Sequence, residues 1–289
     1  MKMKAHILSV GLTAPGLINF KQLETFITEQ KFPNTSEPIE KYSPFFLPPN
    51  ERRRTTSTIK LALKTAEEAW SSYQERVSNA SDQVSVLFVS KDGDTLISSN
   101  ICQALSEEEP MVSPTQFHNS VHNAPVGYWM IGQSNQAPAS AISAGEFAIG
   151  NGLLEAFLQS QERQQPVLVV FYDLPIDEEI PSIEKKSGAD ANIPFAFSMV
   201  LDASQNTRLS NSPICNSPLL SLNVTQEAVE HQLESNPYKG VPAAEVYPLV
   251  KAMAKLNINR SKCETNNAFE ISFPLNAYSF VKVTLNETS

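Results

Sequence analysis

Cysteine is scarce in this chain, and no hydrophobic run is long. Its 289 residues include three widely separated cysteines, Cys102, Cys215 and Cys263. An odd, scattered set is not typical of a disulfide framework or a zinc site, so we expect neither, nor any metal or cofactor. No apolar run approaches the roughly 20 residues that cross a bilayer. The N-terminal stretch has too short an apolar part for a signal peptide and lacks a small-x-small cleavage site. We therefore expect a cytoplasmic protein with no membrane partner.

Positive charge is also in short supply. Lys and Arg number 22 against 31 Asp and Glu, which gives a net charge of −9. A chain without a basic face cannot neutralise phosphates, so we expect no nucleic-acid partner. One basic run, Arg52-Arg53-Arg54, stands just before a helical pattern. Such a short run is typical of a surface cluster or of hydrogen bonding within the chain.

Apolar segments alternate with helical patterns over the first two thirds of the chain. In one pattern, Ile59, Leu63, Ala66, Trp70 and Tyr73 recur at helical spacing. Continuous apolar strands alternating with helices indicate a parallel or mixed sheet covered on both faces. The expected strands are 5–12, 84–89, 167–172 and 193–202, and the expected helices are 19–30, 55–77 and 95–106.

The remainder of the chain is more polar. Residues 174–192 and 203–218 are expected to be loops, and 225–235 and 242–255 show helical patterns. The alternating stretch AFEISFPLNAYSFVKVTL, residues 268–285, predicts a hairpin that turns at Pro274-Leu275-Asn276.

The stretch PASAISAGEFAIGNGLLEAFLQ, residues 138–159, predicts a short strand, a sharp turn and an amphipathic helix. A turn of this kind often presents a nucleophile, and its hydroxyl here is Ser143. Ser143 and Glu146 have the spacing of a capping box, in which each side chain bonds a backbone amide of the other residue. We expect Ser143 to cap the helix, because a serine nucleophile needs a nearby base that this motif does not supply.

Six segments, taken in order, resemble the N-terminal half of a β-ketoacyl synthase, the condensing enzyme of fatty-acid and polyketide synthesis. They are ILSVGLTAPG from residue 7, RRRTTSTIKLALKTAEEAW from 52, FHNSVHNAPVGYWMIG from 117, PASAISAGEFAIG from 138, FAFSMVLD from 195, and the last hairpin with Asn276-Ala277. The resemblance implies an α/β fold of truncated thiolase-like type, with a mixed sheet covered by helices. It implies a single domain, 1–289, in which 1–202 corresponds to the ketosynthase N-terminal half and 203–289 is a reduced C-terminal region.

The chain departs from that family at the residues that do its chemistry. Aligning on Ala148-Ile149-Gly150 places the family's cysteine at Ile142, beside Ser143. The family also needs two histidines, or a histidine and an asparagine, from its second half, and after residue 202 the chain has only His231. The chain therefore lacks the residues with which the family forms and decarboxylates a thioester, and we expect it to have no catalytic residue. The resemblance implies a non-catalytic chain-length factor, most like the short form of aryl-polyene pathways. It would form a heterodimer with an active β-ketoacyl synthase and meet the acyl carrier protein indirectly.

The segment before the turn supplies the candidates for the acyl pocket or the interface. The resemblance implies this role for Phe117, His118, His122, Asn123 and Trp129. His118 and His122 are four apart and would share a face of a helix, which is ligand spacing, but no third ligand accompanies them. Core packing is the alternative for the aromatic residues. For the two histidines we expect polar capping or interface hydrogen bonding rather than metal binding.

Two other functions stay open at this stage. One is a divergent acyltransferase or decarboxylase that uses Ser143, and the other is a stand-alone acyl-binding protein. Cys102, within a helical pattern, is expected to be a buried small hydrophobic residue.

Overall fold

The structure is a computed structural model that describes residues 2–77, 81, 83–174, 193–204, 217–227, 236–238, 241–262 and 268–286. Its strands are β1 (Lys2–Thr13), β2 (Ser85–Val89), β3 (Ala139–Ile142), β4 (Val167–Asp173), β5 (Phe195–Asp202), β6 (Leu219–Thr225), β7 (Phe269–Asn276) and β8 (Ser279–Asn286). Its helices are α1 (Phe20–Thr28), α2 (Pro49–Arg54), α3 (Ser57–Arg76), α4 (Thr95–Ser106), α5 (Pro114–Asn119), α6 (Ala124–Gly132), α7 (Ala148–Arg163) and α8 (Tyr247–Lys262). Short 3₁₀ turns, η1 (Gly145–Phe147) and η4 (Pro242–Val246), precede α7 and α8.

The strands form one mixed sheet, as the alternation of apolar strands and helices predicted. Its order is β3-β2-β4-β5-β1-β6-β8-β7. β2 pairs in parallel with β3 and β4, and the remaining pairs are antiparallel. β3 is therefore an edge strand, and the turn that follows it lies at the same end of the sheet as the carboxyl ends of β2 and β4.

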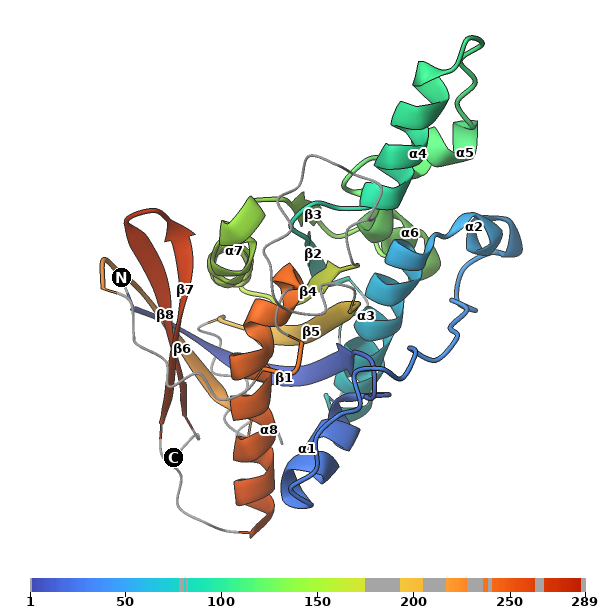
Figure 1. Ribbon diagram of the computed structural model, residues 1–289. Coiled ribbons are helices and arrows are strands. Elements are labelled where there is room, and N and C mark those ends of the chain that lie inside the picture. Colours follow the sequence, from blue (N-terminus) through green and yellow to red (C-terminus); the bar gives the residue numbers. More distant parts are fainter. Residues whose placement is uncertain are drawn as a thin grey trace.

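Helices cover both faces of this sheet (Figure 1). Every residue of β2, β4 and β5 is buried, and successive side chains of these strands enter different clusters on the two faces. α3 and α6 pack in one cluster, whereas α1, α7 and α8 pack in the other. The helical spacing in α3 is confirmed, because all five of its periodic apolar residues are buried.

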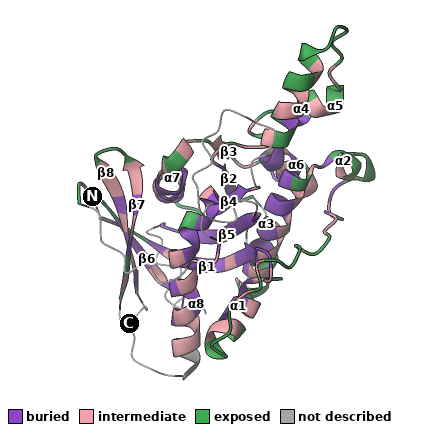
Figure 2. Ribbon diagram, viewed as in Figure 1, coloured by how far each residue is buried: buried purple, intermediate pink, exposed green. Residues whose placement is uncertain are grey.

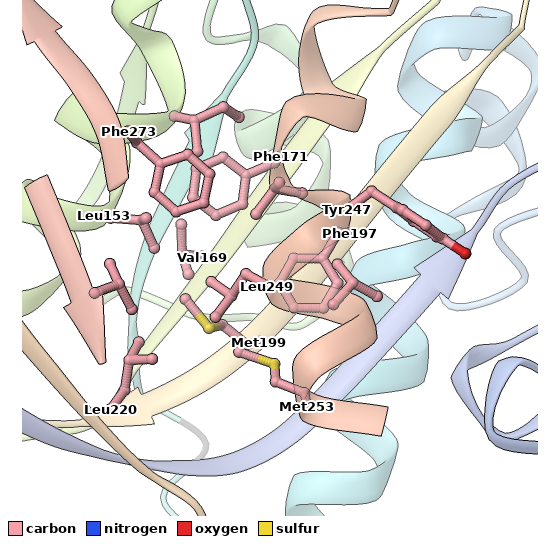
Figure 3. Packing of buried hydrophobic residues seen from close by; sticks show 14 of the residues in the cluster. Leu153, Val169, Phe171, Phe197, Met199, Leu220, Tyr247, Leu249, Met253 and Phe273 are labelled. Carbon is pink, nitrogen blue, oxygen red and sulfur yellow. The ribbon is translucent and has the colours of Figure 1, made fainter. Parts of the chain in front are cut away.

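The second cluster joins parts of the chain that are far apart in sequence. Phe171 of β4 and Met199 of β5 meet Leu153 of α7, Leu249 of α8 and Phe273 of β7 (Figure 3). Full burial of each such side chain contributes about 1.5–3 kcal/mol relative to leaving it exposed. Figure 2 shows that this burial is concentrated in the central strands and the inner helix faces. The C-terminal hairpin is thus built into the same core as the central strands.

The predicted C-terminal hairpin is confirmed, but its turn lies at Ala277-Tyr278 and not at Pro274–Asn276. Pro274 stays within β7, and β7 is an edge strand, where a missing N–H is tolerated. The turn is closed by Asn276, whose Oδ1 accepts a hydrogen bond of 2.8 Å from the Tyr278 amide. The side chain of Asn276, rather than Pro274, therefore stabilises the turn at which the chain reverses direction.

Other expectations for the C-terminal third are tested only in part. The helical pattern at 242–255 is confirmed, as η4 followed by α8, which continues to Lys262. Most of 174–192, 203–218 and 225–235, together with His231, lies outside the described residues. Among the helices that are described, none is long and apolar enough to cross a membrane.

Candidate functional site

β3 ends at Ile142, whose carbonyl oxygen is held from two sides. The Ser90 amide donates a hydrogen bond of 3.1 Å to this oxygen, and the Nε2 atom of His122 lies 2.8 Å from it. A carbonyl oxygen only accepts, so Nε2 of His122 carries the hydrogen in this contact. The end of β3 is thereby tied to the loop after β2 and to the segment before α6.

Ser143 follows Ile142 and is exposed. Its hydroxyl donates a hydrogen bond to the backbone oxygen of Lys91. The predicted capping box is wrong, because Ala144 is the N-cap of η1 and Phe147 the N-cap of α7, and neither makes a side-chain cap bond. Gly145 has a φ of +56°, which breaks the run of helical torsions that a cap at Ser143 requires.

The loop after β2 is anchored by a buried carboxylate that the sequence analysis missed. Oδ1 of Asp173 accepts hydrogen bonds from the Ser90 hydroxyl at 2.7 Å and from the Lys91 amide at 3.0 Å. Burial raises the pKa of Asp173 to about 7, against the opposite effect of these hydrogen bonds. The signal for this residue was an acid at the end of the all-apolar strand VLVVFY.

The start of α7 lies directly on the C-terminal hairpin. A Cβ atom at Gly150 would stand 2.3 Å from the Pro274 carbonyl oxygen, so only glycine fits there. The Asn151 side chain donates to the carbonyl oxygens of Phe147 at 2.9 Å and of Leu275 at 3.1 Å. The turn between β3 and α7 is therefore braced by the hairpin as well as by the loop after β2.

In this arrangement the Ser143 hydroxyl acts as a hydrogen-bond donor. Within the described residues, the Ser143 hydroxyl makes its hydrogen bond to a backbone oxygen, and no histidine, lysine or carboxylate side chain bonds to it. The neighbouring His122 directs its Nε2 hydrogen to Ile142. A serine becomes a nucleophile when a base accepts its proton, and neither contact provides such a base.

The predicted pair of histidines does not share a helix face. α5 contains His118 and ends at Asn119, whereas His122 lies in the break before α6. His118 is exposed and meets the Tyr128 ring edge-on, with 6.2 Å between the ring centroids. Across the described ranges, no three His, Cys, Asp or Glu side chains are grouped so that they could hold a metal ion.

Trp129 and Phe117 differ sharply in exposure. Trp129 is fully buried between Trp70 and Phe46, with edge-on ring contacts at 6.1 and 5.5 Å. It is a residue of this chain's own core, so its burial favours core packing over the predicted role in an acyl pocket or interface. Phe117 on α5 is 66% exposed and is available to a partner. Asn123 is exposed at the start of α6 and makes no cap bond.

Residues 95–121, which we call the arm, project away from the sheet with α4 and α5 (Figure 1). α4 buries only Ile97, so Cys102, expected to be buried, is exposed. The arm instead exposes large apolar side chains, which are Leu96, Leu105, Met111, Phe117 and Val121. An exposed set of this kind is typical of a surface that another protein covers.

Comparisons with known proteins agree with this fold. Residues 27–259 match the family model of the β-ketoacyl synthase N-terminal domain. No curated protein sequence matches the chain.

Three similar solved structures come from ketosynthase complexes. A chain from the Xenorhabdus doucetiae complex of the ketosynthase ApeO with its chain length factor ApeC has a TM-score of 0.65 at 21% identity, with 98% of this chain and 99% of that one covered. A chain of the ishigamide ketosynthase/chain length factor gives 0.69 at 10%, covering 99% and 100%. A chain of AntDE:AntF, a type II PKS acyl-carrier protein in complex with its ketosynthase, gives 0.71 at 11%, covering 99% of each. The family match extends over most of the sequence and the sheet has the ketosynthase arrangement, so this chain belongs to the β-ketoacyl synthase N-terminal-domain family and has its thiolase-like fold.

Proposed function

We propose that this chain is a non-catalytic subunit of the chain-length-factor type. It pairs with an active β-ketoacyl synthase in polyketide synthesis of the aryl-polyene kind, in the cytoplasm, and helps to shape the acyl pocket. The observation that carries the proposal is the edge strand β3, which is open to pairing and ends at a turn with Ile142 and Ser143 where ketosynthases hold a cysteine.

Among the described residues, the outer edge of β3 has a defined set of backbone groups that pair with no other strand. The carbonyl oxygens of Pro138 and Ile142 accept hydrogen bonds from Val86 and Ser90, next to and within the β2 ladder. In a parallel pair, alternate residues face the neighbouring strand, so the backbone groups of Ala139 and Ala141 face outward. An edge of this kind is a template for a strand from another chain.

The arm adds apolar surface to this edge. His122, at the base of the arm, contacts the last residue of β3, so the two surfaces adjoin. Phe117 is the large aromatic side chain that the arm exposes. We assign the edge and the arm to the partner ketosynthase, with Phe117, His118 and Asn123 as contact residues and Phe117 at the wall of its acyl pocket.

The nucleophile and its bases come from the partner in this proposal. Ile142 has no group to form a thioester, and the Ser143 hydroxyl ties two loops together. The similar structures are described in their own names as ketosynthases with chain length factors or with a carrier protein, which supports the pairing of this chain with a ketosynthase.

The edge-strand contact is testable with Ala141→Pro. Proline at this position removes an outward N–H and leaves the ladder to β2 intact, so the chain should fold. We expect wild-type chain to copurify with a co-expressed partner ketosynthase in a fixed ratio, and Ala141→Pro to be lost from the complex. Thermal unfolding of the isolated variant is the control for folding. A folded Ala141→Pro chain that pairs as well as wild type would rule out pairing through β3.

The same preparation tests the two rival functions. An acyltransferase that uses Ser143 would gain the mass of an acyl group from acyl-carrier-protein thioesters, and Ser143→Ala would not; we expect neither to gain it. A stand-alone acyl-binding protein would be a monomer with extractable lipid. Two cavities, of about 470 and 450 Å³, are lined largely by polar residues such as Asp202, Gln161, Gln83 and Arg163, which does not favour an acyl chain.

A further inference from the structure

The arm is joined to the core of the protein at only two buried positions. Residues 95–121 are all described, and among them only Ile97 and Asn119 are buried. Ile97 lies in the first turn of α4, and Asn119 is the last residue of α5. Both helices stand clear of the sheet, above α6 in the view of Figure 1. The position of the arm therefore depends largely on these two side chains.

Asn119 is the polar anchor of the arm. Its Nδ2 atom donates a hydrogen bond of 2.7 Å to the Arg54 carbonyl oxygen, and its Oδ1 atom accepts one of 3.0 Å from the Tyr128 hydroxyl. Arg54 is the last residue of α2, and the final carbonyl oxygens of a helix have no partner within that helix. Tyr128 is buried in α6. One side chain thus ties α5 to both α2 and α6.

The two hydrogen bonds of Asn119 fix its amide in one orientation. The Arg54 carbonyl oxygen only accepts, so Nδ2 faces it and Oδ1 faces Tyr128. Hydrogen bonds weaken steeply when they are bent, whereas apolar contact of the kind that Ile97 makes has no preferred direction. A buried polar group with both atoms bonded specifies one arrangement of its neighbours. Asn119 therefore fixes the direction of α5 as well as its place.

Phe117 is carried by the same short helix, two residues before this anchor. The amide and the hydroxyl of Ser120 donate to the Phe117 carbonyl oxygen at 3.2 and 2.9 Å. The Phe117 ring is 66% exposed, so its own burial contributes little to its position. A movement of α5 would consequently carry Phe117 with it.

We propose that Asn119 is a positioning residue that sets product length, because it holds α5 and Phe117 at one place against the acyl pocket of the ketosynthase. This assignment rests on the proposed function, which puts Phe117 at the wall of that pocket. A wall limits the length of a growing chain only if it resists displacement, since overpacking is relieved when the wall yields. Loss of the anchor should make the products longer and more varied, while the partner's condensing chemistry is unchanged.

Hydrogen–deuterium exchange of the isolated chain tests the anchor without any product. Asn119→Ala removes both hydrogen bonds and should speed amide exchange over residues 114–121 by about tenfold, as the loss of one to two hydrogen bonds implies. Tyr128→Phe keeps the buried ring and removes one of the bonds, so it should give a smaller increase. This second variant also serves if Asn119→Ala does not fold.

The matched control is Asn236→Ala. Asn236 also donates to a backbone oxygen, that of Ala244 at 2.9 Å, and accepts from the Tyr238 amide at 2.9 Å. These bonds lie beside η4 and not at the arm, so the control should leave exchange over residues 114–121 unchanged.

Product mass from the complex reconstituted with a ketosynthase tests the role in product length. Asn119→Ala and Tyr128→Phe should each shift the products toward longer and more varied chains, and Asn236→Ala should not. Asn119→Ala combined with Phe117→Ala should give the distribution of Phe117→Ala alone, because Asn119 acts through Phe117. A merely structural role would lower stability and yield and leave the length distribution as it is.

Four results would overturn the proposal. They are unchanged exchange over residues 114–121 in Asn119→Ala, faster exchange with no change in product length although Phe117→Ala shifts it, a further shift on adding Asn119→Ala to Phe117→Ala, and loss of ketosynthase pairing by Asn119→Ala. If Phe117→Ala itself leaves product length unchanged, the wall in the proposed function is wrong and product control by Asn119 falls with it. The exchange measurement then decides separately whether Asn119 anchors the arm.

Discussion

The Ser143 hydroxyl donates a hydrogen bond to the backbone oxygen of Lys91, and so joins the turn after β3 to the loop after β2. The amide of the same Lys91 donates to buried Asp173. One residue of the loop thereby connects an edge strand to a central strand. The position of the turn depends on this connection rather than on a helix cap.

Ser143→Ala should remove this tie and lower the free energy of unfolding by roughly 0.5–1.5 kcal/mol. Product formation by the assembled complex should persist, because the hydroxyl takes no part in the proposed chemistry. Urea unfolding and product yield measure the two effects, and Ser143→Thr, which keeps a hydroxyl, is the control. Complete loss of product from a folded, assembled Ser143→Ala complex would contradict this account.

Phe117→Ala should shift the products toward longer chains and leave the condensation rate little changed. A growing chain stops where further extension would force overpacking, at a cost of roughly 1–3 kcal/mol, and removal of a wall residue removes that cost. Product mass from the reconstituted complex is the measurement. Leu105→Ala, another exposed apolar residue of the arm, is the control. An unchanged length distribution from a fully assembled Phe117→Ala complex would exclude this residue as the wall.

Glu68 should make stability depend on pH. Its carboxylate accepts hydrogen bonds of 2.9 Å from the amides of Leu12 and Phe20, and burial raises its pKa from 4.5 to about 7 despite them. A raised pKa means that the folded state favours the protonated form. The stability from this group is therefore complete below about pH 4.5 and is lost as the pH rises to about 7, by about 1.4 kcal/mol per pH unit.

Glu68→Gln should remove the part of the pH dependence of the unfolding free energy that Glu68 contributes. The variant also loses one amide hydrogen bond, which lowers its overall stability. The measurement is the free energy of urea unfolding at several values between pH 4.5 and 7.5. Asp173, whose pKa burial also raises to about 7, should contribute a second slope of the same sign that remains in the variant. Identical slopes for wild type and Glu68→Gln would show that Glu68 is ionised throughout this range.

Replacing each of two glycines by alanine should change the stability of the chain in opposite directions. At Gly150 a Cβ would meet the Pro274 oxygen at 2.3 Å, so Gly150→Ala should destabilise the chain by roughly 1–3 kcal/mol or more. At Gly127, within α6, a Cβ would meet nothing within 4 Å, so Gly127→Ala should stabilise by about 0.5–1 kcal/mol. Melting temperatures compare the two. A Gly150→Ala variant as stable as wild type would mean that α7 can move away from the hairpin.

The helices and strands were predicted well from local sequence patterns. Burial of one helix face produces apolar residues at helical spacing, and burial of both faces of a strand produces a continuous apolar run. The apolar run of β4 and the periodicity of α3 are examples, and both hold. The break between α5 and α6 was missed, since the sequence there keeps an apolar pattern while the chain turns at Ser120–Asn123.

The site was harder to predict because long-range backbone contacts define it. The oxygen that receives the Ser143 hydroxyl belongs to a main-chain group 52 residues away, and any residue type at position 91 has such an oxygen. The local signal for a cap was strong, but the left-handed torsion of Gly145 overrode it. Likewise, the sequence around Trp129 does not indicate that its ring packs against Trp70 and Phe46.

The close contact between Gly150 and Pro274 also bears on how the molecule is made. The turn and the start of α7 are synthesised near the middle of the chain, yet the backbone against which they pack is more than 120 residues further on. A ribosome-bound chain that has emerged only as far as α7 has no hairpin to complete that contact. Because distant pairings form late, the turn should reach its final position only after β7 has left the ribosome, and the edge of β3 would be ready for its partner last.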